Sequence, residues 1–234
     1  HDADAGVALD QPANRIEGNP DGSSDTIQFG SLDFPAPNAM VFDSSGNLFV
    51  SDSFQGAIYR IDNAHICIAP CGVTTVLHDP LLATAGFPPF GANGLALKDD
   101  FTLFVANTGD DRVLKVDLAA SPVSVSVFTE SINGADGIAF DDNGILWVAA
   151  NQADEIVGLN AAGRVVAKIG AFDKIGADGA PEGLLFPASL VLVGREVYIT
   201  NLALPLTPAV GDEPEEDVTR WTVSRFRLLP NRRQ

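Results

Sequence analysis

Short apolar runs separated by polar turns recur along the chain in a fixed order. A first run is followed by a polar turn, and a second run of β-branched and aromatic residues comes directly after it. Two of these turns end in Gly46 and Gly144, and glycine tolerates the positive φ of a tight hairpin. First runs lie at residues 39–42, 94–97 and 137–140, and second runs at 48–50, 103–105, 146–148 and 197–199. The pattern predicts repeated β-hairpins.

Each hairpin continues into two further strands. A third run with alternating character is found at residues 58–61, and weaker fourth runs at 74–77 and 123–128. The copies begin at Asn38, Asn93, Asp136 and Ala188, which gives spacings of 55, 43 and 52 residues. Such spacings are typical of four-stranded propeller blades with outer loops of variable length. The alternative is a β-sandwich of short strands, which the in-phase recurrence of a long pattern disfavours.

The repeat predicts an all-β fold, a single β-propeller domain over residues 1–234. Its blades are expected at 38–90, 91–132, 133–186 and 187–230, with 1–37 as a partial blade or closing strand that includes a strand at 26–30. We expect about four full blades of a six-bladed ring, on a chain that lacks roughly the first two. A closed five-bladed ring is the alternative. No helix of useful length is predicted, because Pro and Gly are spread evenly.

Charge and composition narrow the classes of partner. The chain carries a formal net charge of −17 in 234 residues, and 46% of them are hydrophobic. This composition is globular, and the charge disfavours nucleic acid and anionic membranes, both of which are negative. No apolar run approaches the roughly 18 residues of a membrane span. The first residues lack a signal-peptide profile, yet the composition is compatible with an extracellular or periplasmic protein, which we expect.

The two cysteines, Cys67 and Cys71, are separated by three residues. A small-loop disulfide is one interpretation, and it would suit a secreted protein. Structural zinc is the other, although no second pair of ligands is found. The sequence leaves this choice open.

The residue before each first strand is the main candidate for chemistry. First strands line the central channel of a propeller, so Asn38, Asn93 and Asp136 are predicted to point into one mouth of it. Ala188 holds the fourth such position. Carboxylate and amide oxygens are the ligands of a hard cation such as Ca²⁺. The alternative is that Asn and Asp here simply suit strand-entry turns.

At these residues the sequence resembles a known family. Residues 92–97 and 135–140, each followed by a hairpin ending in Leu-Phe-Val-Ala or Leu-Trp-Val-Ala, look like the SMP-30/gluconolactonase family. They are also similar to the paraoxonases, which share its six-bladed fold, and residues 37–42 match the preceding blade. The resemblance covers residues 37 to about 203. NHL-type repeats use similar hairpins.

The resemblance implies a metal-dependent hydrolase of lactones or esters. A channel cation, Ca²⁺ or alternatively Zn²⁺, would be held by Asn38, Asn93 and Asp136, and Asp136 would also orient or deprotonate the attacking water. The first-blade Glu of that family has no counterpart before Asn38. Glu17 lacks the expected following strand, and Glu182 lies near the wrong end of the chain. The basic residue often found near the first Asn is also absent.

A second set of polar residues is predicted where each second strand ends. The hairpin should return these residues to the same mouth, where they could bind substrate hydroxyls, buttress the ligands, or serve as polar turn residues. They are Asp52, Asn107, Asn151 and Asn201.

Rival functions remain on the same fold. One is a non-catalytic, NHL-like propeller that binds a protein or glycan, and another is a propeller lyase or sugar-binding protein that uses the same channel cation. The chain has no Gly-x-Ser-x-Gly elbow, no His-Glu-x-x-His motif and no phosphate-binding glycine loop. Residues 213–217 are predicted to form a solvated loop before a last strand at 222–226.

Overall fold

The computed structural model describes residues 15–18, 22–27, 35–68, 70–207 and 209–229. The chain divides into two compact units, His1–Ser131 and Ile132–Gln234. The division falls between the second and third predicted blades. The prediction of a single domain stays a prediction.

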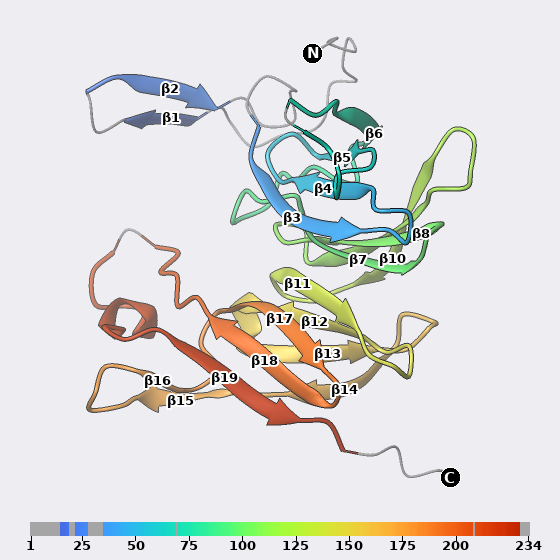
Figure 1. Cartoon of the computed structure of the whole chain (residues 1–234). Helices are drawn as coiled ribbons and strands as arrows, with labels where there is room; N and C mark the ends of the chain where they lie inside the picture. Colours follow the sequence, from blue (N-terminus) through green and yellow to red (C-terminus); the bar gives the residue numbers. More distant parts are fainter. Residues whose placement is uncertain (1–14, 19–21, 28–34, 69, 208, 230–234) are drawn as a thin grey trace. The chain divides into compact units, whose positions relative to one another are not determined.

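Unit 1 holds a hairpin and two four-stranded antiparallel sheets (Figure 1). We call the sheet β3-β4-β5-β6 blade 1 and the sheet β7-β8-β9-β10 blade 2. The strands are β1 (Arg15–Gly18), β2 (Ser24–Ile27), β3 (Pro37–Phe42), β4 (Leu48–Asp52), β5 (Ala57–Ile61), β6 (Thr74–His78), β7 (Ala92–Asp99), β8 (Thr102–Asn107), β9 (Arg112–Asp117) and β10 (Ser124–Glu130). Strand β7 packs against β3 and β4, so the first strands of the two blades are neighbours.

Unit 2 repeats this plan with one strand fewer. Blade 3 is the four-stranded sheet β11-β12-β13-β14, and blade 4 is the three-stranded sheet β17-β18-β19. The strands are β11 (Ala135–Phe140), β12 (Leu146–Ala150), β13 (Glu155–Leu159), β14 (Val165–Ile169), β15 (Phe172–Ile175), β16 (Pro181–Gly183), β17 (Pro187–Val193), β18 (Glu196–Asn201) and β19 (Thr222–Arg227). Two 3-10 turns, η1 (Asn151–Ala153) and η2 (Pro214–Asp217), complete it. Strand β17 contacts β11 and β12.

The hairpin turns form as their sequences predict. In the turn after β3, the Asp43 carboxylate accepts the backbone N–H groups of Ser45 and Asn47, both at 2.9 Å, and Gly46 has φ +83°. Asp141 binds the N–H groups of Asn143 and Ile145 in the same way after β11. An aspartate that caps its own turn, followed by a glycine at positive φ, closes both hairpins.

Each unit has its own hydrophobic core between its blades. In unit 1, Ile58, Leu103 and Leu114 are fully buried, and in unit 2 Ile156 and Ile199 are. These residues belong to the second and third strands of their blades. By contrast, β3 and β17 each expose every second residue or nearly so.

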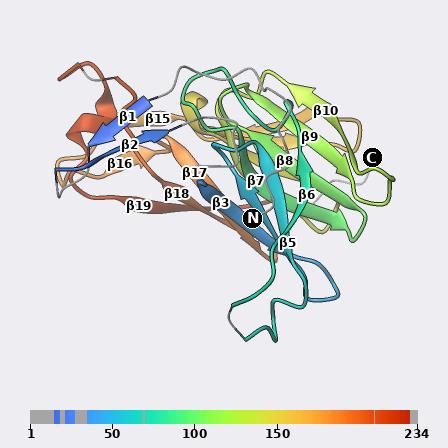
Figure 2. The same cartoon turned by 90° about the horizontal axis from the view of Figure 1, so that it is seen from above.

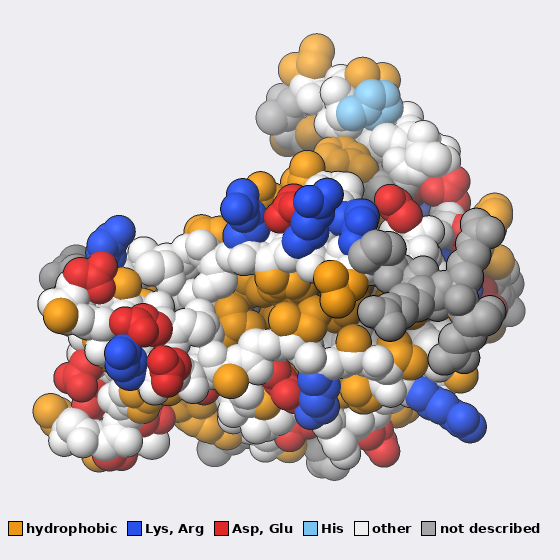
Figure 3. All heavy atoms as spheres, turned by 90° about the horizontal axis from the view of Figure 1, so that it is seen from below, with side chains coloured by type: hydrophobic (Ala, Val, Ile, Leu, Met, Phe, Trp, Pro, Cys, Tyr) orange, Lys and Arg blue, Asp and Glu red, His pale blue; other side chains and the backbone are white. Residues whose placement is uncertain are grey.

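A pocket of about 590 Å³ lies in unit 2 between β14 and β19. Figure 3 shows this face, where hydrophobic side chains gather in a hollow with Lys and Arg along one rim. Its walls include Trp147, Ile169 and Phe226, and Asp141 stands at its edge. Asp141 follows the last residue of β11, whereas Asp136 is the second residue of that strand. The pocket therefore lies at the end of blade 3 away from Asp136.

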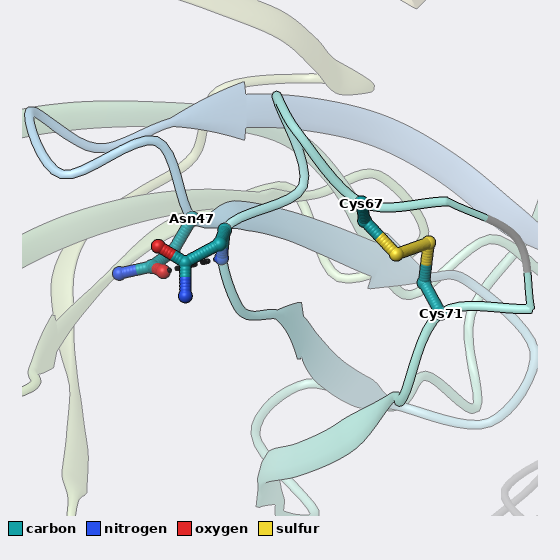
Figure 4. Close-up of a disulfide and its surroundings, with 4 residues drawn as sticks. Asn47, Cys67 and Cys71 are labelled. Atoms are coloured by element: carbon teal, nitrogen blue, oxygen red, sulfur yellow. Dashed lines mark hydrogen bonds between the residues drawn. A yellow bond between two sulfur atoms is a disulfide. The ribbon is translucent and has the colours of Figure 1, made fainter.

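Cys67 and Cys71 form a disulfide in the loop between β5 and β6 (Figure 4). The loop extends beyond the strands of blade 1 (Figure 2). Nearby, the Asn47 side chain accepts the backbone N–H of Asn63 at 2.9 Å. The disulfide interpretation is therefore the one that the structure supports, and neither cysteine remains as a thiol for metal binding.

The predicted strands of the repeat are found, and the described residues contain no α-helix. Three differences stand out. The hairpin β15–β16 was not predicted, η2 occupies most of the predicted loop at 213–217, and β2 is Ser24–Ile27, while residues 28–30 of that predicted strand lie outside the described residues. In the described part of the chain, no helix is long and apolar enough to span a membrane.

Candidate metal centre

The four candidate positions share an unusual backbone feature. In every blade the first residue of the inner strand pairs with the last residue of the second strand, and the ladder then slips by one residue. A slip of this kind is a β-bulge, which re-aims a side chain out of the regular alternation. The residue that follows the paired one, within the bulge, is Asn38, Asn93, Asp136 or Ala188. The four residues that the sequence repeat aligns are therefore structurally equivalent.

A second backbone bond fixes the same corner in every blade. The residue directly after the paired end of the second strand donates its N–H to the carbonyl two residues before the candidate position. The four bonds are Ser53 to Ala36 (3.0 Å), Thr108 to Gly91 (3.3 Å), Asn151 to Gly134 (3.0 Å) and Leu202 to Phe186 (3.0 Å). This residue therefore lies beside the candidate position in all four blades.

In three blades the two neighbouring side chains are hydrogen-bonded to each other. Asn38 Nδ2 donates to Ser53 Oγ at 3.0 Å, and Asn93 Nδ2 donates to Thr108 Oγ1 at 2.9 Å. In blade 3 the neighbouring residue carries the amide and the candidate residue is the acceptor: Asn151 Nδ2 donates to Asp136 Oδ2 at 3.2 Å. Each pair is separated by 15 residues. We call these the three polar pairs.

Unit 1 brings Asn38 and Asn93 together through Ser53. The Ser53 hydroxyl accepts from Asn38 and donates to the carbonyl of Ala92 at 2.8 Å, next to Asn93. Ser51 also donates to the carbonyl of Asn93, at 2.6 Å. Asn93 is buried and Asn38 is exposed. Asp136 belongs to unit 2, so the meeting of all three side chains stays a prediction.

The sequence predicted Asn151 as the last residue of a second strand, but that strand ends one residue before it. Strand β12 ends at Ala150, which pairs with Ala135, and Asn151 opens η1. Asn151 is therefore equivalent to Ser53 and Thr108, which sequence reasoning did not select. The constant separation of 15 residues between each candidate ligand and its neighbour was the signal that could have found them.

The other three residues of the second set are buried and bonded to backbone or to their own blade. Asp52 accepts N–H groups from Ala36 at 2.7 Å and from Gln55 at 2.9 Å. Asn107 donates to the carbonyls of Leu81 and Ala83. Asn201 accepts the N–H of Leu185 and donates to the hydroxyls of Thr222 and Ser224. These contacts favour the role of supporting the candidate ligands. Substrate binding by these residues stays a prediction.

Buried ionisable groups near these corners have shifted acidity. Burial raises the pKa of Asp52 although three backbone N–H groups bind its carboxylate. Burial and then the charge of Asp52 raise the pKa of Tyr59 to about 12. In unit 2, burial raises the pKa of Asp154, whose carboxylate accepts the N–H of Phe186 at 2.8 Å. Desolvation disfavours the charged form, which explains the direction in each case.

The candidate ligands suit a hard cation. In the two Asn residues of the polar pairs the amide nitrogen is the donor to a hydroxyl, so the amide oxygen is the atom turned to other partners. Asp136 adds a carboxylate, and such oxygen atoms are what Ca²⁺ binds in proteins. The described residues hold no group of three or more His, Cys, Asp or Glu side chains that could bind a metal. A cation site among them would therefore depend on amide oxygens as well. Glu182, the other acidic candidate, is 3.5 Å from Lys174 on the β15–β16 hairpin.

The sequence model of the SMP-30/gluconolactonase/LRE-like region matches residues 37–172, more than half of the chain. The chain belongs to this family. The match runs from β3 to the first residue of β15 and contains the three polar pairs. The resemblance predicted from the sequence is therefore confirmed. No curated protein sequence matches the chain.

Solved structures show the fold of the family. A luciferin-regenerating enzyme is 18% identical with a TM-score of 0.60, over 94% of this chain and 72% of that one. A gluconolactonase from Xanthomonas campestris is 14% identical with a TM-score of 0.52, over 80% and 61%. A calcium-binding regucalcin from Agrobacterium tumefaciens is 16% identical with a TM-score of 0.50, over 70% and 52%. The chain thus spans between about half and three quarters of their lengths. The β-propeller fold class is confirmed, and the number of blades in the whole ring stays a prediction.

Proposed function

We propose that this family member is a lactonase- or esterase-type hydrolase that uses a divalent cation, Ca²⁺ first, held by Asn38, Asn93 and Asp136. One observation carries the proposal: three bulge positions in a chain of this family bear oxygen ligands, and each ligand is hydrogen-bonded to the equivalent neighbour. The family membership and the likeness to a gluconolactonase and a calcium-binding regucalcin support it.

The chain's own residues have distinct tasks in the proposed reaction. Asn38 and Asn93 present neutral amide oxygens, and Asp136 supplies the negative charge. Asp136 accepts the proton of the attacking water as its oxygen adds to the lactone or ester carbonyl carbon. The acyl C–O bond then breaks, and the leaving alkoxide takes back the proton from Asp136, which gives a hydroxy acid from a lactone and an acid and an alcohol from an ester. The bound cation would supply stabilisation of the negative charge that develops on the carbonyl oxygen.

Cation binding by the full chain is the primary test. After treatment with a chelator, calorimetric titration with CaCl₂ is expected to give a binding isotherm, and Asn93→Ala and Asp136→Ala should weaken it at least about tenfold. Asn143→Ala is the matched control, because Asn143 is an exposed hairpin residue of blade 3. Hydrolysis of γ- and δ-lactones and of phenyl acetate, followed by acid release, completes the test.

Two outcomes would sink the proposal. If the wild-type chain binds neither Ca²⁺ nor Zn²⁺, or if both variants bind like wild type, the cation site is wrong. In that case the non-catalytic binding module becomes the better hypothesis. Substitutions in the exposed loop at Phe87, which is 61% exposed, would then be the ones to affect partner binding.

A further inference from the structure

The partner of each candidate ligand changes with the chemistry of the ligand. Where the ligand is an amide, the neighbour is a hydroxyl: Asn38 with Ser53 and Asn93 with Thr108. Where the ligand is the carboxylate of Asp136, the neighbour is the amide of Asn151. Where the position holds no polar group, at Ala188, the neighbour is Leu202.

We propose that Ser53, Thr108 and Asn151 are positioning residues, each of which determines which oxygen atoms its own hydrogen-bonded candidate ligand presents to a cation. This inference rests on the proposed function, because it concerns the same site. None of the three is assigned to bind the cation itself. Neighbours of this kind orient metal ligands in many proteins and are nearly as important as the ligands.

Ser53 shows how the orientation is set. An asparagine can offer either its oxygen or its NH₂ group, and a hydroxyl can both donate and accept. The one proton of the Ser53 hydroxyl goes to the carbonyl of Ala92 at 2.8 Å. Toward Asn38 the same hydroxyl can only accept, which it does at 3.0 Å. Asn38 must therefore turn its NH₂ group to Ser53 and its oxygen away.

Blade 2 places the corresponding pair of an amide and a hydroxyl in a buried setting. Asn93 is 6% exposed and Thr108 is 1% exposed, so water competes little for their bond of 2.9 Å. A hydrogen bond away from water is electrostatically stronger than one at the surface. Thr108 is therefore the neighbour whose loss should be felt most strongly at an amide ligand.

Asn151 holds Asp136 at an evident cost. Its Oδ1 atom is buried without a hydrogen-bond partner, and a Cβ on Gly134 would lie 1.8 Å from that atom. Turning the amide over would satisfy nothing, because its oxygen would then face the Asp136 carboxylate. Buried polar atoms are rarely left unpaired, and here the amide keeps its bond from Nδ2 to Asp136 while its oxygen has no partner among the described residues.

Blade 4 separates this role from a structural one. Leu202 makes the same backbone bond, to Phe186, that Ser53, Thr108 and Asn151 make in their blades. The corner therefore closes without a polar pair. Among the four described blades, the blade whose bulge residue has no side-chain oxygen is also the one whose neighbour is apolar, as positioning requires and as closure of the hairpin alone does not.

The test compares Thr108→Val with Thr108→Ser in the full chain. Valine keeps the shape of threonine and removes the hydroxyl, whereas serine keeps the hydroxyl. We expect the valine variant to bind Ca²⁺ about 10- to 100-fold more weakly, and the serine variant to bind close to wild type. Thr200→Val is the matched control, because Thr200 accepts the N–H of Ser189 in blade 4, whose bulge position, Ala188, carries no side-chain oxygen.

Two readouts distinguish positioning from stability. Calorimetric titration gives the affinity for Ca²⁺, and thermal unfolding with and without Ca²⁺ gives the shift that the cation produces. The shift should shrink in Thr108→Val and stay unchanged in Thr200→Val, whatever each change does to the metal-free protein. Equal affinities of Thr108→Val and wild type would overturn the inference and leave the proposed function intact. Absence of Ca²⁺ binding in wild type would overturn both.

An exchange of pair types adds an independent check. Thr108→Asn alone puts an amide against the amide of Asn93 and should weaken Ca²⁺ binding. Asn93→Asp together with Thr108→Asn recreates the pair of blade 3 and should recover affinity relative to the single change. A double variant no better than Thr108→Asn alone would speak against complementary pairs.

Discussion

Blades 3 and 4 share one backbone corner and fill it with different side chains. Two residues before the candidate position, blade 3 has Gly134 at φ +66° and blade 4 has Phe186 at φ +44°. Both residues are in the left-handed region, where an aromatic residue is strained and a glycine is not. Both accept the N–H of the residue beside the candidate position. The difference therefore comes from side chains and not from the path of the chain.

The neighbouring side chain explains the difference. In blade 3 the Asn151 amide occupies the space that a Cβ on Gly134 would need. In blade 4 the neighbour is Leu202, and Phe186 is buried with its N–H bound to Asp154. Burial of an aromatic ring offsets the backbone strain. The requirement for glycine therefore comes from the Asn151 amide in blade 3, and it is shared neither by blade 4 nor by blade 1, which has Ala36 at this position.

Gly134→Ala tests this requirement and should have the largest effect. The new Cβ would displace Asn151 from Asp136 or push the backbone nitrogen of Gln152, 2.9 Å away, and the positive φ adds strain. We expect a loss of about 2–4 kcal/mol in the free energy of unfolding, measured by urea denaturation.

Gly144→Ala is the matched control for that change. Gly144 also has positive φ, at +76°, but nothing lies within 4 Å of the place that an added Cβ would occupy. Only the backbone strain of about 1 kcal/mol should appear. Equal losses at both glycines would show that Asn151 does not set the requirement.

Asp52→Asn carries the comparison to blades 1 and 2, with a smaller effect. Asp52 and Asn107 occupy the same position, and each accepts an N–H three residues later, from Gln55 and Asp110. The other polar atom of each side chain binds a different kind of group. The second carboxylate oxygen of Asp52 accepts the N–H of Ala36, whereas the NH₂ group of Asn107 donates to two carbonyls. The change would set an NH₂ group against an N–H donor and should cost about 1–3 kcal/mol in urea denaturation. A neutral or stabilising result would mean that relief of the buried charge outweighs the lost bond.

Asp154→Asn should have the smallest effect and change how stability depends on pH. Burial raises the pKa of Asp154, so the folded protein binds more protons than the unfolded chain. The stability from this group is present at low pH and is lost as pH rises through the raised pKa. Asparagine can still accept the N–H of Phe186 and suits the φ of +54°. We expect a gain below about 1 kcal/mol at pH 7 that disappears near pH 4.

Thermal unfolding between pH 4 and pH 7 measures that dependence. Glu215 should respond as well, because its pKa is raised by burial first and then by the charge of Asp154. Removing that charge should lower the pKa of Glu215 and flatten the curve further. An unchanged slope in the variant would contradict the assignment to Asp154.

The amino-acid sequence by itself determined the repeat, the strands and the equivalence of Asn38, Asn93, Asp136 and Ala188. These features are local, because a period of two, capped turns and a glycine at the hairpin can all be recognised within one blade. The same pattern placed Asn151 at the end of a strand, since nothing in one blade alone reveals where the ladder slips.

Only the tertiary structure decided which side chains meet. Ser53 serves Asn38 because the chain returns 15 residues later to the same corner, and its proton is used by Ala92 of the next blade. Asp52 and Asn107 likewise bind backbone groups of loops, but Asp52 accepts from an N–H group and Asn107 donates to a carbonyl. A side chain's role depends on whether its neighbour donates or accepts, and folding, not residue type, supplies that neighbour.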